Sequence, residues 1–224
     1  WVPFRILATQ IQWYPYCKIA VMKPSTSSTA PRLPDRSHGP ENAEFEIKKA
    51  YNCVIEAEVT HFWDRRPIPG VNPREVVEMN RHSFRAYRNN DRLAAERWAR
   101  TSKHLSRALW HEAKIAYLEA HSADLPFLEG APAEAFNLHE KSDTTEDLLN
   151  SVADHVPRGL TKQPHTMTRY LTRAREHLAY LDREGYRHEL LRAERIKAAH
   201  EYGRVLECMA LALEAEAAHV KKTA

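Results

Sequence analysis

The chain has 224 residues, and its 33 Lys and Arg against 30 Asp and Glu leave a formal net charge of only +3. Its length and its 43% hydrophobic content suit a single domain with a sizeable core, which excludes a wholly disordered chain. The 6 glycines fall well below the average usage of about 7%. Strand-rich folds need glycine at tight turns and bulges, so the composition favours helices.

The cysteines and the hydropathy pattern indicate the compartment. Cys17, Cys53 and Cys208 are far apart and show no C-x-x-C spacing, which predicts free thiols in a reducing environment. No apolar run approaches the roughly 18 residues that a membrane helix needs. We therefore expect a cytoplasmic protein that has no membrane contact.

The N-terminal region is expected to lie outside the folded domain. Prolines and charges interrupt its first 21 residues, so we do not expect a signal peptide there, and Met22 is a candidate for the biological start. A Pro- and Ser-rich stretch follows. We expect residues 1–41 to be a disordered tail or a non-native N-terminal extension, and residues 42–224 to form one all-α domain.

Proline placement predicts where long helices lie. All 13 prolines occur at or before position 164, and the intervals 74–125 and 165–224 contain none. Proline inside a helix costs about 3 kcal/mol, so proline-free intervals are where long helices form.

Apolar spacing and capping residues predict the first two helices. A first helix is expected from about 43 to 64, with an apolar face of Ile47, Tyr51, Val54, Ile55 and Phe62. A second is expected to begin at Asn72-Pro73-Arg74-Glu75, a capping box with proline at its preferred position. Its expected inner face is Val77, Phe84 and Tyr87.

The remaining pattern predicts a bundle. After a turn at Asn89-Asn90-Asp91, a long helix is expected to about residue 121. Two further helices are expected, one from about Met167 to a C-cap at Gly185 and one over about 186–220. The segment at about 122–164 is broken by prolines and glycines, and a short helix near 144–155 is expected there after the caps Asp143 and Thr144. The sequence thus predicts an all-α fold: a single bundle of five or six helices with an irregular crossing segment.

Charge is distributed unevenly along the chain. Residues 74–107 carry nine Lys or Arg against four Asp or Glu, whereas residues 108–156 carry two against ten. The two blocks either pair within the fold or leave a basic stripe free to bind phosphates or an acidic partner. The stripe comprises Arg81, Arg85, Arg88 and Arg92, which recur at helical spacing.

Two Glu-x-x-His pairs have the spacing used in di-iron carboxylate bundles. They are Glu58 with His61 and Glu216 with His219. A chain with 13 histidines produces such pairs by chance, so ordinary ion pairs are the simpler interpretation and no metal is expected.

The stretch Arg195-Ile-Lys-Ala-Ala-His200-Glu-Tyr202 resembles the R-x4-H-x-Y signature of one branch of the HEPN superfamily. Members of that superfamily are small α-helical proteins that often act as metal-independent ribonucleases. Residues 92–109 also resemble the alanine-rich second helix of such bundles. The resemblance implies that Arg195 and His200 act at a phosphodiester, with Tyr202 nearby, and meet their copies across a dimer. Histidine can move protons there while arginine stabilises the phosphorane charge.

Three functions remain open. The chain has no P-loop, G-x-G-x-x-G, G-x-S-x-G or HExxH motif, so nothing indicates those nucleotide-binding or hydrolase classes, and no cofactor is expected. The leading hypothesis is a non-catalytic α-helical interaction or scaffold protein that acts as a homo-oligomer or with a protein partner. The alternative is a HEPN-like ribonuclease using Arg195 and His200, with RNA as its substrate. A di-metal carboxylate bundle is the third.

Overall fold

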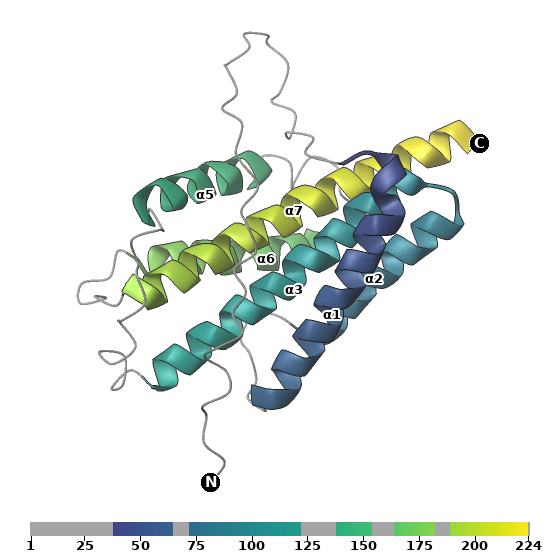
Figure 1. The fold of residues 1–224 in the computed structure, drawn as a ribbon. Coiled ribbons are helices and arrows are strands. Elements are labelled where there is room, and N and C mark those ends of the chain that lie inside the picture. Colours follow the sequence, from purple (N-terminus) through teal and green to yellow (C-terminus); the bar gives the residue numbers. More distant parts are fainter. Residues whose placement is uncertain (1–37, 65–71, 122–137, 154–163, 182–188, 224) are drawn as a thin grey trace, which may run out of the picture. The chain divides into compact units, whose positions relative to one another are not determined.

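The computed structural model describes residues 38–64, 72–121, 138–153, 164–181 and 189–223, and every regular element among them is helical (Figure 1). The predicted all-α fold is confirmed. The elements are η1 (Pro40–Asn42), α1 (Ala43–Asp64), α2 (Pro73–Arg88), α3 (Arg92–Ala120), α5 (Leu138–Ala153), α6 (Pro164–Ala179) and α7 (Glu189–Thr223). None of these helices combines the length and apolarity that crossing a membrane requires.

Contacts divide the chain into two units, Trp1–Arg32 and Leu33–Ala224, and all the described helices belong to the second. Most of the expected N-terminal tail, residues 1–37, lies outside the described residues.

The helices pack around α3 and α7, which share the most extensive contact in the fold. α1 and α2 pack on α3, whereas α5 and α6 pack on α7 (Figure 1). Large side chains from both halves are fully buried at the centre, including Trp98 of α3, Tyr170 of α6 and Tyr202 of α7. The long central pair therefore carries the other helices on its two sides.

Side-chain caps begin α2 and α3, and both helices start at the boundaries that the sequence predicts. The Asn72 side chain accepts a hydrogen bond from the backbone N–H of Arg74 at 3.0 Å. The Asp91 carboxylate accepts one from the N–H of Ala94 at 3.1 Å. The turn between these helices places Asn90 at a φ of 58°, a left-handed conformation that asparagine tolerates better than most residues. Both predicted boundaries are confirmed.

The apolar faces predicted for α1 and α2 are partly wrong. Tyr51 and Ile55 are 52% and 43% exposed, and Phe84 is 42% exposed. Ile47 and Val54 of α1 are buried as predicted, but α1 also buries Ala50 and Ala57, which leaves Tyr51 and Ile55 at its flank. Helical spacing locates an apolar stripe but does not decide which edge of the stripe a neighbouring helix covers. The side chain of Phe62 is not among those described.

The crossing segment contains more helix than predicted. α5 begins at Leu138, so Asp143 and Thr144 lie inside the helix and are not its caps. The hydroxyls of Thr144 and Thr145 donate to the carbonyl oxygen of Lys141 at 3.1 and 2.7 Å, bonds that threonine makes within a helix. The flanking residues 122–137 and 154–163 lie outside the described residues, as does the predicted cap Gly185.

Gly203 allows α5 to lie close against α7. A Cβ atom at this position would stand 2.8 Å from Cδ2 and 3.1 Å from Cγ of Leu148. Leu148 and Leu149 of α5 are both buried there. The absence of a side chain at Gly203 therefore sets the distance between these two helices.

We expect Gly203→Leu to lower the free energy of unfolding by about 1–3 kcal/mol, because the added side chain overpacks the contact with Leu148. Urea denaturation followed by circular dichroism measures the change. Ala218→Leu, on the exposed side of the same helix, is the control and should change stability by less than about 0.5 kcal/mol. Equal stability of the two variants would contradict a close α5–α7 contact at Gly203.

Candidate functional site

Polar side chains join α3 to α7 along two series of positions spaced by multiples of seven residues. The first series is His104 with Glu201 and His111 with Glu194, at N···O distances of 2.6 and 2.7 Å. The second is Trp98 with Glu216, Glu112 with Tyr202 and Glu119 with Arg195. A seven-residue repeat keeps one stripe of a helix facing its partner. We call these five pairs the α3–α7 polar ladder; they run antiparallel and specify one register.

Glu112 is the centre of a buried charge cluster. Its carboxylate accepts two hydrogen bonds from Arg173, both at 2.7 Å, and one each from His177 and Tyr202, both at 2.9 Å. Burial by itself raises the pKa of Glu112, but the hydrogen bonds from Arg173 and His177 outweigh it and hold that pKa at about 2. The hydrogen bonds from its neighbours therefore keep Glu112 in its charged form.

His177 connects this carboxylate to Arg195. Arg195 lies with Nη1 3.2 Å from Nδ1 of His177, and because arginine only donates, we assign the ring proton to Nε2, which donates to Glu112. Burial lowers the pKa of His177, which favours the neutral ring that this arrangement requires. Arg195 also binds Glu119 and lies 3.8 Å from the ring centre of Tyr180.

A small cleft of about 180 Å³ opens beside this cluster. Its lining is formed by Glu112, Ile115, Ala116, Glu119, Arg173, Tyr180 and Arg195. The two carboxylates balance the two guanidinium groups, and the ring of His177 is fully buried behind them. A carboxylate that is hydrogen-bonded to a histidine can transfer protons in an enzyme. Here, however, the polar contacts of Glu112 and His177 join helices α3, α6 and α7 to one another.

The structure brings Arg195 and Tyr202 into this cluster and places His200 elsewhere. Five residues separate Arg195 from His200, which corresponds to a rotation of about 140° around a helix. Both ring nitrogens of His200 face α5: Nε2 lies 3.3 Å from Nζ of Lys141, and Nδ1 lies 3.3 Å from Oγ1 of Thr145. Burial and the charge of Lys141 lower the pKa of His200 to about 3. A neutral His200 thus attaches α5 to α7.

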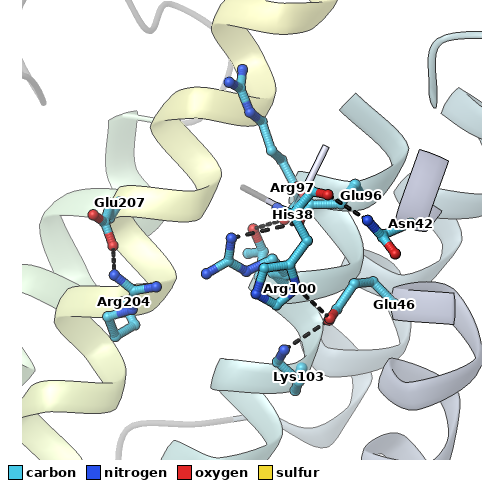
Figure 2. Close-up of polar contacts among 10 residues, drawn as sticks. His38, Asn42, Glu46, Glu96, Arg97, Arg100, Lys103, Arg204 and Glu207 are labelled. Carbon is cyan, nitrogen blue, oxygen red and sulfur yellow. Dashed lines mark hydrogen bonds and ion pairs between the residues drawn. The ribbon is translucent and has the colours of Figure 1, made fainter. Parts of the chain in front are cut away.

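A second buried cluster lies where α1, α3 and α7 meet (Figure 2). Glu46 of α1 accepts from Lys103 at 2.8 Å and lies 3.1 Å from Nδ1 of His38. Burial raises the pKa of Glu46, but Lys103 and His38 outweigh it and the net shift is downward. Across the same interior, Arg97 donates to the carbonyl oxygen of Leu211 at 2.8 Å. This cluster also binds helices together.

The candidate metal ligand Glu216 and the buried cysteine of α7 contribute to hydrogen bonding and packing in the described part of the fold. Glu216 accepts a hydrogen bond from Nε1 of Trp98 at 2.8 Å, and His219 lies in the last turns of α7. The side chains of Glu58 and His61 lie outside the described part of the structure. Within that part, no group of three or more His, Cys, Asp or Glu is arranged to hold a metal ion. Burial raises the pKa of the free Cys208 thiol to about 11, so it is a poor nucleophile.

Three of the four arginines in the predicted basic stripe form one exposed surface. Arg81, Arg85, Arg88 and Arg92 are all exposed, but only the first three share one side of α2, and we call these three residues the arginine face. Arg92, at the start of α3, instead stacks over the ring of Tyr87 at 5.6 Å, on another side of α2, and its charge acts on Glu44 of α1. Among the described residues no ion pair involves a residue of the arginine face.

Two other exposed side chains adjoin the arginine face. Phe84, 42% exposed, lies between Arg81 and Arg88 on the same side of α2. Glu78 lies one turn before Arg81, and it too has no ion pair within the described residues. The face therefore combines an excess of positive charge with one aromatic contact.

Local patterns in the sequence indicate Arg195, Tyr202 and the arginines of α2, but they do not indicate Glu112 and His177 as site residues. His177 follows Arg173 by four residues on a predicted helix, which is the one local signal it offers. Its contact with Glu112 joins positions 65 residues apart, and no spacing rule predicts it.

No protein-family model matches the chain, and neither does any curated protein or solved structure.

We expect Glu112→Gln to lower the free energy of unfolding by about 3 kcal/mol at pH 7, because it leaves Arg173 without its buried counter-charge. The loss should also depend on pH. Glu112 has a pKa of about 2 in the folded protein against 4.5 for an ordinary carboxyl group, so its stabilisation is complete above pH 4.5 and disappears as the pH falls through about 2. Urea denaturation over this pH range measures both effects.

Glu119→Gln is the control, since Glu119 is 44% exposed and its loss should cost less than about 1 kcal/mol. A gap between wild type and Glu112→Gln that stays constant from pH 7 to pH 2 would contradict the assigned role of Glu112.

Proposed function

We propose that this protein is a non-catalytic helical interaction protein that binds an acidic protein surface through the arginine face. The observation that carries the proposal is that Arg81, Arg85 and Arg88 lie exposed on one side of α2, and none of them takes part in an ion pair among the described residues. A positive surface of this kind attracts an acidic partner and speeds its association.

The contrast with the interior arginines supports this role. Arg173, Arg195 and Arg204 are each bound to a carboxylate. On α2, by comparison, Arg81 and Arg85 are four residues apart, and like charges at that spacing destabilise a helix by about 0.2–0.5 kcal/mol per pair. An acidic partner would convert this repulsion into attraction.

The arrangement of the interior supports a non-catalytic role. His177 is fully buried and both its nitrogens are engaged, and both nitrogens of His200 face α5. A general base has to reach the proton that it removes, which requires hydrogen-bond distance to a substrate. These histidines already use that capacity to hold helices together.

Binding of a fluorescein-labelled oligoglutamate peptide, followed by fluorescence anisotropy, tests the proposal. We expect the wild-type chain to bind with an affinity that falls as salt is added, because the contact is between exposed charges. The variant R81E/R85E/R88E should bind at least tenfold more weakly.

The matched control is R175E/K221E/K222E, which makes the same change in net charge at exposed positions of α6 and α7. It should keep most of the wild-type affinity, and circular dichroism should show all three proteins folded. Equal losses in both variants would show that net charge alone governs binding. Binding of a single-stranded RNA but not of the peptide would also contradict an acidic protein as the partner.

A HEPN-like ribonuclease is the second candidate function. It is favoured by one observation: Arg195 and Tyr202 lie in one cluster, with a histidine, beside a cleft. That histidine is His177, whereas the sequence motif supplies His200.

This candidate predicts that the purified chain cleaves a labelled single-stranded RNA in the presence of a metal chelator. His200→Ala should abolish cleavage if the motif assignment holds, and His177→Ala if the cluster beside the cleft is the active site. RNA that remains intact over hours at micromolar protein concentration would remove this candidate.

A further inference from the structure

A second exposed charged surface lies on α5. Its residues Asp143, Glu146 and Asp147 are exposed, and none of them takes part in an ion pair among the described residues. They share one side of the helix, opposite the buried Leu148, Leu149 and Val152. We call Asp143, Glu146 and Asp147 the acidic face.

Within one copy the acidic face and the arginine face belong to different sides of the fold. α5 packs on α7 and α6, whereas α2 packs on α3 and α1 (Figure 1). Each charged face is the side of its helix turned away from that packing. The basic and acidic blocks of the sequence therefore leave part of their charge unmatched within the described chain.

We propose that the arginine face of one copy binds the acidic face of a second copy. This inference rests on the proposed function and identifies its acidic partner as another copy of the same chain. The two surfaces have complementary charge and cannot satisfy each other within one molecule.

The spacing of the charges supports a side-by-side contact between α2 and α5. On α2, Arg81 and Arg85 stand four residues apart, and on α5 Asp143 and Asp147 have the same separation. At about 1.5 Å per residue both separations are about 6 Å along the helix, so two acids of one copy can face two arginines of the other.

The position of the two faces determines the kind of assembly. Because they lie on different sides of the fold, the contact joins unlike surfaces and is head-to-tail. Head-to-tail contacts produce rings when the rotation between copies closes and open chains when it does not. We therefore expect assemblies larger than a dimer as the protein concentration rises.

Sedimentation velocity of the full chain over a range of protein and salt concentrations tests the inference. The wild type should associate at low ionic strength and dissociate as salt is added. The variants R81E/R85E/R88E and D143K/E146K/D147K should each remain monomeric, because each carries two faces of the same sign. R175E/K221E/K222E should associate like the wild type.

Mixing the two charge-reversed variants is the decisive measurement. In the mixture every basic face again has an acidic face to bind, so association should return, and a chain carrying all six substitutions should also associate. Return of association further shows that the substitutions leave the fold intact.

A wild type that stays monomeric at every concentration would overturn the inference, as would a mixture that remains monomeric. Neither result affects the proposed function, which is judged separately by loss of oligoglutamate binding in R81E/R85E/R88E. Self-association that is insensitive to both sets of reversals would place the contact on another surface and would also overturn the inference.

Discussion

The α3–α7 polar ladder is the constraint on which the rest of the fold depends. Apolar helix faces can slide by a turn and still bury similar area, but a buried carboxylate has few acceptable positions. Sliding α3 along α7 would separate Glu194 from His111 and Glu201 from His104 and leave these buried carboxylates without those partners, which costs several kcal/mol. We infer that these pairs specify the antiparallel register, a role that polar groups have in other helical assemblies.

The register of α3 and α7 in turn determines where the two charged faces and the cluster around Glu112 lie. α2 lies on α3 and presents the arginine face, α5 lies on α7 and presents the acidic face, and α6 completes the cluster around Glu112. Because the interior charges are bound to one another, the recognition that we propose uses exposed groups on the outside of α2 and α5. The charges in the interior are paired, whereas those of the two exposed faces are not. This difference favours the proposed interaction role over a catalytic one.

Local signals in the sequence predicted much of this architecture. Asn72 and Asp91 are caps whose effect reaches only two or three residues, so the starts of α2 and α3 were predictable. The same holds for the row of arginines on α2, because helical spacing alone places them on one side. The start of α5 was not predictable, since the hydroxyls of Thr144 and Thr145 serve equally well as caps or as bonds within a helix.

The sequence by itself determined the helical class, the boundaries marked by caps and prolines, and the rows of charge along single helices, because all of these depend on neighbours within about one turn. Only the tertiary structure decided which apolar edges are covered, which histidine meets Arg195 and where unmatched charge remains. His177 and Glu112, like Tyr202 and Glu112, meet across 65 and 90 residues of chain. Such contacts follow from how whole helices pack, and that packing depends on the summed burial and charge pairing of the entire bundle.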